Sequence, residues 1–270
     1  MTQIYAEVIG DPIGHSKSPL IHGFWLKALG IDGDYRATHV TPEGLGDYFT
    51  ARRADPAWRG CNITIPHKQA ALDHVEDRGS VRDTIGAINL ALVAEDGALI
   101  GTNTDAGGFY APIADLDLAG APVAVIGAGG AARAVLFALS RIGVGPVTVF
   151  NRNVLKAAAL LSTFGLKGQA LPLTAPLPAA SLLVNTSALG MVGQPPLVVD
   201  LSPLPEHALV YDLVYAPLET PLLAAARVRD LDTVDGLEML IGQAALAFEL
   251  LFGAAPPRER DDELRALLGG

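Results

Sequence analysis

Residues 123–132 read VAVIGAGGAA, and this stretch decides the fold. Four uninterrupted apolar residues are typical of a strand that is buried on both faces of a parallel sheet. The glycines after them match the G-x-G-x-x-G/A pattern with Ala132 in third place, and the residues that follow continue as a helix. Gly127 permits the tight turn, and Gly129 lets a pyrophosphate approach the backbone at the helix N-terminus. The stretch therefore predicts a Rossmann-type dinucleotide-binding domain.

The end of the next predicted strand, VTVF at residues 147–150, selects the cofactor. An NAD site would place Asp or Glu there to bind the ribose 2′-hydroxyl. This chain instead has Asn151, Arg152 and Asn153, with Lys156 close by. A carboxylate would repel a 2′-phosphate, whereas a guanidinium can bind it with two hydrogen bonds. We predict that the cofactor is NADP(H).

The chain before this domain has a different organisation. Up to about Thr102, short strands alternate with helical stretches, which predicts a mainly parallel sheet covered by helices. AINLALVAEDGALIGT is predicted to close this unit as a hairpin that turns at Asp96-Gly97. The segments read as strands or helices in this part are AEVIG, SPLIHGFWLKALG, YRATHV, PEGLGDYFTARR and CNITI.

The chain after VTVF is predicted to complete the second sheet and then return to the first domain. NVLKAAALLSTFG is expected to be a helix, and LLVNTS, ALVYDLV and LDTVD to be strands. From Gly236 one apolar stripe runs along a helix that must pack on another element. We predict an α/β protein of two α/β domains. The first comprises residues 1–104 plus 237–270 and binds the substrate, and the second comprises residues 105–236 and binds NADP.

Composition excludes several classes of function. The formal net charge is −10 and no basic run occurs, which disfavours nucleic-acid binding. Prolines interrupt the longest charge-free stretch, 168–199, and the N-terminus does not resemble a signal peptide, so no membrane partner is expected. Cys61 is the single cysteine, which fits a reducing cytoplasm. The six scattered histidines show no metal-site spacing, and no metal is predicted.

A second informative stretch is RGCNITIPHKQAALDHV, residues 59–75. Apolar and polar residues alternate up to Ile65, as in a strand with one apolar face. Pro66 suits the first position of a helix, which would place Lys68 in the first helical turn. A cation there opposes the helix dipole at a cost of about 0.3–1 kcal/mol. Because locally unfavourable choices tend to mark functional sites, Lys68 is a candidate functional residue.

Other polar groups in the first unit and at its end suggest a site for an anionic substrate. Ser18 is expected to cap the first helix, with Pro19 at its first position, and Ser16 and Ser18 could bind a carboxylate. Asn89 precedes the hairpin in GAIN. Asp105, in GTNTDAGG, lies where the two domains join, and we expect it to face a cleft in which cofactor and substrate meet.

Taken together, these stretches resemble the shikimate dehydrogenase family nearly from end to end. The resemblance implies NADP-dependent, reversible reduction of 3-dehydroshikimate to shikimate in the pathway to chorismate and the aromatic amino acids. The motifs that carry it occur in the family's order. They are GDPIGHSKSPLIH, GCNITIPHK, IGAIN, GTNTDAGG, GAGGAAR, NRN, NTSALGM, DLVYAPLETPLL and GLEMLIGQA.

The resemblance also implies roles for individual residues. Lys68 and Asp105 would be catalytic and act as a coupled pair, with Lys68 giving its proton to the oxygen of the reduced ketone. The substrate would be held by both of these and by Ser16, Ser18, Thr64, Asn89, Tyr215 and Gln243. The cofactor would contact Gly127, Ala128, Gly129, Gly130, Ala131, Asn151, Arg152, Asn153, Lys156, Leu213 and Gly236. The NTSALGM loop is expected beside it, with Thr186 and Ser187 as minor contacts.

Three positions depart from the family's pattern. Gly23 stands where the family often has Asn, Leu90 where it usually has Thr, and Asn153 ends the NRT-like motif. We expect modestly changed packing near Asn89 and slightly altered contacts with the 2′-phosphate. None of the three departures removes a proposed catalytic group.

Alternative functions remain open at this point. A quinate/shikimate dehydrogenase that uses NAD would be favoured by an acidic residue after the second strand of the nucleotide domain or by Thr in place of Ser18. Neither feature is present. A nonenzymatic NADP-binding regulator should have lost Lys68 or Asp105, and this chain has both. Glutamyl-tRNA reductase has a similar glycine loop, but this chain has neither its cysteine context nor charge for tRNA. The oligomeric state could be monomer or homodimer.

Overall fold

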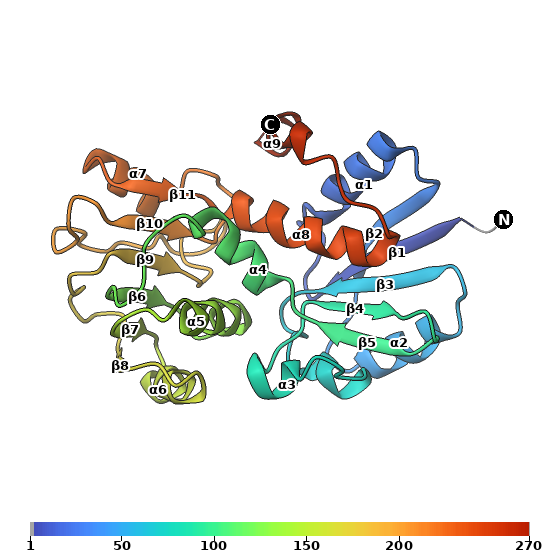
Figure 1. The fold of residues 1–270 in the computed structure, drawn as a ribbon, viewed down its shortest axis with the longest axis horizontal. Helices are drawn as coiled ribbons and strands as arrows, with labels where there is room; N and C mark the ends of the chain where they lie inside the picture. Colours follow the sequence, from blue (N-terminus) through green and yellow to red (C-terminus); the bar gives the residue numbers. More distant parts are fainter. Residues whose placement is uncertain (1–2, 270) are drawn as a thin grey trace. The chain divides into compact units, whose positions relative to one another are not determined.

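The computed structural model describes residues 3–269, and these form two compact units. The first unit combines residues up to Thr104 with those from Ile241 onward, and the second spans Asp105–Leu240 (Figure 1). The predicted second boundary, between 236 and 237, lies at the start of helix α8 (Gly236–Phe252), whereas the units divide inside that helix.

A six-stranded sheet forms the centre of the second unit. Its order is β11-β10-β9-β6-β7-β8, and each neighbouring pair is parallel. Counted from β6 as the first strand, this is the 3-2-1-4-5-6 order of the dinucleotide-binding fold. The strands are β6 (Val123–Ile126), β7 (Val147–Phe150), β8 (Gly168–Leu171), β9 (Leu182–Asn185), β10 (Leu209–Asp212) and β11 (Asp232–Val234).

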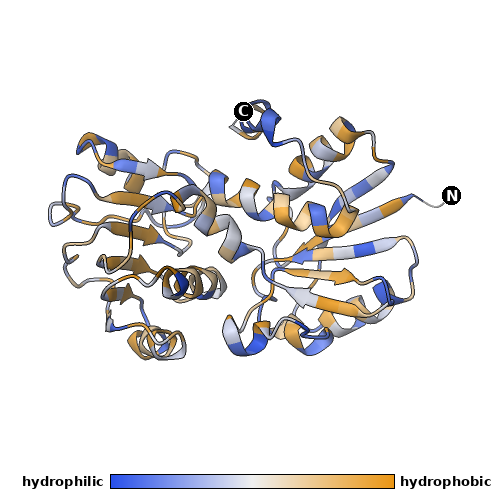
Figure 2. Ribbon diagram, in the orientation of Figure 1, coloured by the Kyte–Doolittle hydropathy of each residue, from blue (hydrophilic) through white to orange (hydrophobic). Residues whose placement is uncertain are grey.

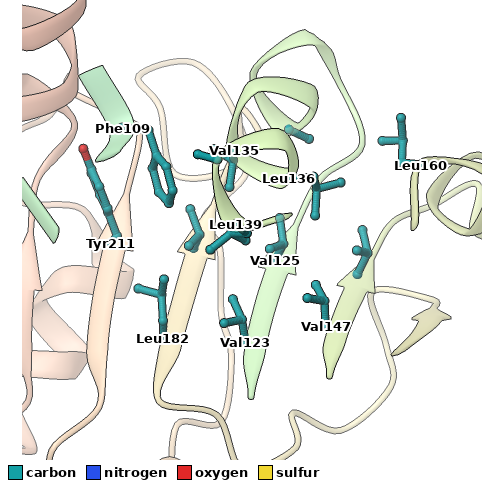
Figure 3. Packing of buried hydrophobic residues seen from close by; sticks show 14 of the residues in the cluster. Phe109, Val123, Val125, Val135, Leu136, Leu139, Val147, Leu160, Leu182 and Tyr211 are labelled. Atoms are coloured by element: carbon teal, nitrogen blue, oxygen red, sulfur yellow. The ribbon is translucent and has the colours of Figure 1, made fainter. Parts of the chain in front are cut away.

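Both faces of this sheet are covered, as the uniformly apolar strands predict (Figure 2). Val123 and Val125 pack on one side with α4 (Asp105–Tyr110), α5 (Gly130–Ile142) and α6 (Val154–Thr163), as Figure 3 shows around Phe109 and Leu139. Ala124 and Ile126 pack on the other side with α7 (Pro221–Val228) and several loops. Three elements of this unit, β8, α4 and α7, were not predicted from the sequence.

The first unit is built on a five-stranded sheet of order β2-β1-β3-β4-β5. Strand β1 pairs in parallel with β2 and β3, and the β4–β5 hairpin is antiparallel. Within the described residues, β4 alone runs against the other strands of this sheet, and the hairpin turns at Asp96-Gly97 as predicted. The strands are β1 (Ile4–Gly10), β2 (Gly33–His39), β3 (Trp58–Ile63), β4 (Leu90–Val93) and β5 (Leu99–Thr102).

Helices complete the first unit. Its sheet places Tyr35 on the face that contacts α1 and α8, where the indole of Trp25 packs edge-on against Phe248. Residue Glu7 lies on the opposite face, where Arg52 binds its buried carboxylate with two hydrogen bonds. The helices are α1 (Ser18–Leu29), α2 (Leu45–Arg53), α3 (Val81–Thr84), α8 and α9 (Asp261–Gly269), with short 3-10 turns η1 (Ala70–His74), η2 (Ala111–Ile113, in the second unit) and η3 (Arg258–Arg260).

The predicted helix after Pro66 is wrong. Strand β3 ends at Ile63, residues 65–69 form turns, and the following helical segment is the five-residue 3-10 turn η1. Lys68 therefore does not lie in a first helical turn, and the dipole argument does not apply to it. Ile65 is also 67 % exposed rather than paired with buried Ile63, because it lies beyond the end of the strand.

The predicted cap of the first helix is also wrong. Helix α1 starts at Ser18 with Lys17 in the capping position, so Ser18 is the first helical residue and Pro19 the second. The hydroxyl of Ser16 accepts a hydrogen bond from the backbone nitrogen of Ser18 at 3.3 Å. Ser16, two residues earlier, thus satisfies one of the free N–H groups of the helix start.

Candidate active site

The carboxyl ends of β1 and β3 lie side by side, and in parallel sheets ligands bind at this edge. Thr64 follows β3 and donates its backbone N–H to the carbonyl of Ile9 at 2.9 Å. A Cβ on Gly10 would lie 2.6 Å from the Thr64 methyl group, so only glycine leaves room for this approach. Gly10, the first glycine of the GDPIGHS motif, thus leaves the space that the Thr64 side chain occupies.

Two hydrogen bonds hold the turn that contains Lys68, one made by the preceding side chain and one by the backbone of Lys68 itself. The preceding residue, His67, is buried, and its Nε2 lies 2.6 Å from the carbonyl of Val40, so this ring nitrogen is the protonated one. The carbonyl of Lys68 itself accepts the N–H of Ile88 at 2.8 Å. Because Ile88 is the neighbour of Asn89, the half-buried Lys68 is fixed next to the backbone of another predicted site residue.

Asn89 belongs to a buried cluster of polar side chains with Thr104 and Gln243. The Asn89 amide donates to the Thr104 hydroxyl at 2.8 Å and to the Gln243 carbonyl oxygen at 3.2 Å. The side-chain oxygen of Asn89, Oδ1, accepts the backbone N–H of Thr104 at 2.7 Å. The structure thus brings together Asn89 and Gln243, two residues that are 154 positions apart.

Ser16 and Ser18 lie in the segment that leaves β1 and enters α1. Ser18 is buried and Ser16 is half-buried. Their neighbour Lys17 donates a hydrogen bond from Nζ to the carbonyl of Leu268 in α9. The cation between the two serines is therefore turned to the C-terminal helix, so the two serine hydroxyls rather than this ammonium are the groups considered for a ligand.

In the second unit, the glycine loop has the shape that its sequence predicts. Gly127 has φ +108°, and a Cβ there would lie 2.5 Å from the Thr186 hydroxyl, so this glycine is required by the chain itself. Gly129 is different, because a Cβ there would meet nothing within 4 Å. It precedes α5 without any side-chain cap, which leaves the first N–H groups of the helix available to an anion. The space at Gly129 fits a cofactor pyrophosphate.

The residues after β7 divide into two pairs. The Asn151 amide donates to the carbonyl of Asn153 at 2.8 Å, and the Asn153 side chain caps α6 by accepting the N–H of Lys156 at 3.0 Å. Among the described residues, the exposed side chains of Arg152 and Lys156 have no hydrogen bond or ion pair. Two cations are therefore available to a phosphate, while the asparagine side chains shape the turn.

A buried network that the sequence did not predict joins β9, β10 and α7. Asn185 donates to Asp212 at 2.8 Å, and Asp212 also accepts from the Thr220 hydroxyl at 2.7 Å and from the N–H of Val214 at 3.0 Å. The side-chain oxygen of Asn185, Oδ1, accepts both the N–H and the hydroxyl of Ser187. Burial raises the pKa of Asp212, against the effect of these donors. The network fixes the loops that begin after Asn185 and Asp212.

Three further predicted residues, Leu213, Tyr215 and Gly236, lie in or beside these loops, and a fourth, Asp105, lies at the start of α4. Leu213 donates its N–H to the carbonyl of Asn185 at 3.0 Å, and a Cβ on Gly236 would lie 2.4 Å from the Leu213 carbonyl oxygen. Tyr215 is half-buried, and burial raises the pKa of its hydroxyl. Asp105 is buried and is the first residue of α4.

Sequence reasoning missed the buried polar residues that support the site, namely Tyr35, Asn62, Thr104, Asn185 and Asp212. Four of them occur in motifs already singled out, which was the signal available: Asn62 in GCNITIPHK, Thr104 in GTNTDAGG, Asn185 in NTSALGM and Asp212 in DLVYAPLETPLL. Across residues 3–269 no cluster of three or more His, Cys, Asp or Glu side chains could hold a metal ion. In the same range, none of the helices has the length and apolar character needed to span a bilayer.

Comparison with known families covers most of the chain. The model of the shikimate dehydrogenase substrate binding domain matches residues 8–91, and that of shikimate / quinate 5-dehydrogenase matches residues 111–180. A shikimate 5'-dehydrogenase C-terminal domain model matches residues 236–261.

Individual proteins are similar over nearly the full length. The shikimate dehydrogenase (NADP(+)) of Sphingopyxis alaskensis is 68% identical over 264 residues, which cover 98% of this chain and 96% of that protein. Shikimate 5-dehydrogenase of Thermus thermophilus, solved in complex with NADP(H) and shikimate, has 37% identity and a TM-score of 0.84 over 98% of this chain and 99% of that one. The ligand-free 5-ketofructose reductase of Gluconobacter has 29% identity and a TM-score of 0.88, with 99% of each chain covered.

Proposed function

This chain belongs to the shikimate dehydrogenase family, and we propose that it catalyses the reversible, NADP-dependent reduction of 3-dehydroshikimate to shikimate. The observation that carries the proposal is the 68% identity to a shikimate dehydrogenase (NADP(+)) over 98% of the chain. The fold by itself would not decide the substrate, because a 5-ketofructose reductase has a similar structure.

Preference for NADP(H) is supported by the cations after β7. Arg152 and Lys156 follow the strand where an NAD site would have a carboxylate, and their side chains are exposed. We assign the 2′-phosphate to Arg152 and Lys156, and the pyrophosphate to the backbone N–H groups that follow Gly129. Asn151 and Asn153 contribute the shape of the turn rather than free side-chain donors.

We assign catalysis to Lys68 and Asp105. When bound, NADP(H) supplies or accepts the hydride. Negative charge then develops on the carbonyl oxygen of the substrate, and the Lys68 ammonium stabilises this charge and donates the proton. In the oxidative direction the amine of Lys68 takes up the proton of the alcohol. Asp105 is assigned as the second catalytic group, as the resemblance implies.

The remaining polar groups are assigned to substrate binding. Ser16 and Ser18 would hold the carboxylate of the substrate, as the resemblance implies. Thr64, Asn89, Tyr215 and Gln243 would bind the ring hydroxyls, and the buried contact between Asn89 and Gln243 orients two of these amides before the substrate arrives. We place the reaction in the cytoplasm, where the lone Cys61 stays reduced.

The function is tested by following the absorbance of the reduced nicotinamide with four combinations: shikimate or quinate, each with NADP or NAD. The proposal expects rapid turnover with shikimate and NADP, and weaker turnover with NAD. Activity only with quinate and NAD would assign the chain to a quinate dehydrogenase. No turnover with any pair, in a protein that binds NADP, would favour a nonenzymatic regulator.

A further inference from the structure

Asn89 is held by its backbone as well as by its side chain. Its backbone carbonyl oxygen accepts two hydrogen bonds, from the N–H of Ile63 at 2.8 Å and from the side-chain amide of Asn62 at 3.3 Å. The N–H of Asn89 donates to the carbonyl of Thr102 at 3.2 Å. Asn62 is therefore a side-chain support beneath a proposed substrate-binding residue, and it comes from the neighbouring strand β3.

Tyr35 holds the oxygen end of the Asn62 amide. The Tyr35 hydroxyl donates to the Asn62 carbonyl oxygen at 2.6 Å, and this contact is buried. An Asn side chain offers an acceptor on one side and a donor on the other, and the two have nearly the same shape. The backbone carbonyl of Asn89 can only accept a hydrogen bond, so the NH₂ group of Asn62 faces it, and the Asn62 oxygen faces the tyrosine hydroxyl, which donates to it.

Tyr35 in turn is fixed by an aromatic stack. The His22 ring lies parallel to it, with 3.9 Å between ring centroids and 3° between planes. Trp25 and Phe248 flank the histidine at 5.7 Å and 5.8 Å. Burial raises the pKa of Tyr35 well above its usual value, so the hydroxyl keeps its proton and remains a donor at every working pH.

We propose that Tyr35 is a positioning residue for the substrate site, which acts through Asn62 to hold Asn89 in the place where it binds a ring hydroxyl. This inference rests on the proposed function of Asn89. The Tyr35 hydroxyl touches neither substrate nor cofactor in this assignment. Its loss would leave the buried Asn62 oxygen without its donor, so the amide that supports the Asn89 backbone carbonyl would be held less firmly.

The test compares Tyr35→Phe with Tyr48→Phe. Each variant removes one hydroxyl, and the two hydroxyls lie on opposite faces of the same sheet: Tyr48 donates to Glu7 at 2.8 Å, with no bond to Asn62 or Asn89. Shikimate affinity is measured by calorimetry, so that it does not depend on turnover, and kcat and both KM values are measured alongside. Thermal melting of both variants reports the purely structural cost.

Tyr35→Phe is expected to weaken shikimate binding about 3- to 10-fold, the loss that one net hydrogen bond corresponds to. The KM for shikimate should rise to match, while kcat and the KM for NADP change less than about 2-fold, because binding to ground and transition states is weakened alike. Tyr48→Phe should leave shikimate affinity unchanged even if it lowers the melting temperature.

Two double variants separate positioning from a general effect on the fold. In an Asn62→Leu background, and again in an Asn89→Ala background, Tyr35→Phe should have no further effect on shikimate affinity. An unchanged affinity in Tyr35→Phe alone, an equal loss in Tyr48→Phe, or full additivity with Asn62→Leu would overturn the proposal. Failure of the proposed function itself is distinct, because the unmodified protein would then not bind shikimate.

Discussion

Asn185 and Asp212, both fully buried, are joined by a hydrogen bond of 2.8 Å between the amide of the first and the carboxylate of the second. They end the adjacent strands β9 and β10, 27 residues apart in the chain. Each also binds the loop that follows its own strand: Asn185 holds Ser187, and Asp212 holds Val214. One pair of side chains therefore fixes two of the loops to which cofactor contacts were assigned.

Replacing Asp212 by Ala should lower the free energy of unfolding by about 3–5 kcal/mol, because three buried donors lose their acceptor at once. Asp212→Asn keeps the shape and should cost less. Urea unfolding measures both, with Asp232→Ala as a control at an exposed position. A loss below about 1 kcal/mol in Asp212→Ala would show that the network does not hold the loops.

The two glycines of the nucleotide loop should respond in opposite ways to alanine. Gly127→Ala forces a side chain into φ +108° and against Thr186, so stability should fall. Gly129→Ala meets open space at φ −91°, so the fold should keep its melting temperature while the KM for NADP rises at least about 10-fold. Steady-state kinetics and thermal melts distinguish the two effects. Normal cofactor affinity in Gly129→Ala would place the pyrophosphate elsewhere.

Arg152→Ala should raise the KM for NADP about 10- to 100-fold, the loss of a charge-assisted pair with a phosphate. The KM for NAD, which lacks the 2′-phosphate, should stay within about 2-fold. Arg141→Ala, at the far end of α5, serves as the control because it removes the same charge from the same unit. Equal losses with both cofactors would assign Arg152 to another part of the nucleotide.

The buried ring of His22 predicts a loss of stability in acid. Burial lowers its pKa to about 3 from 6.5, so between these values the unfolded chain binds a proton that the folded chain does not. Its effect on stability is constant above about pH 6.5 and grows more unfavourable as the pH falls toward 3. At pH 5 it amounts to about 2 kcal/mol.

Unfolding in urea at pH 7.5 and pH 5 tests this effect. His22→Phe should lose about 2 kcal/mol less between the two pH values than the unmodified protein. His207→Gln, at an exposed histidine, should behave like the unmodified protein. Identical pH dependence in His22→Phe would mean that the buried ring is protonated in the folded state.

The parts of the fold that followed from sequence are those with a local signal. The four apolar residues of β6 and the glycines after them specify strand, turn and helix within one stretch. Strand β8 has no such signal, because GQAL lies at the sheet edge, exposed or half-buried throughout. The helix predicted after Pro66 had the right residue types, but the contact of His67 with Val40 holds that segment as turns.

The site followed the same rule. Lys68, Asn89 and the glycine loop could be chosen from motifs, whereas their supports could not. Tyr35 and Asn62 meet only when β2 and β3 flank β1 in one sheet. Asn62 lies in the GCNITIPHK motif, but nothing in that motif indicates that its side chain supports Asn89. Contacts of this kind depend on tertiary structure, and they decide how firmly the recognised residues are held.

The most direct test of the proposed chemistry is the turnover of Lys68→Ala, measured together with its affinity for shikimate. The predicted result is a fall in turnover of about 10²–10⁴, the usual contribution of a positioned proton donor, with shikimate affinity nearly intact. Lys27→Ala, which removes an exposed lysine from the end of α1, should keep full turnover. Full turnover in Lys68→Ala would contradict the assignment of Lys68 as the group that transfers the proton.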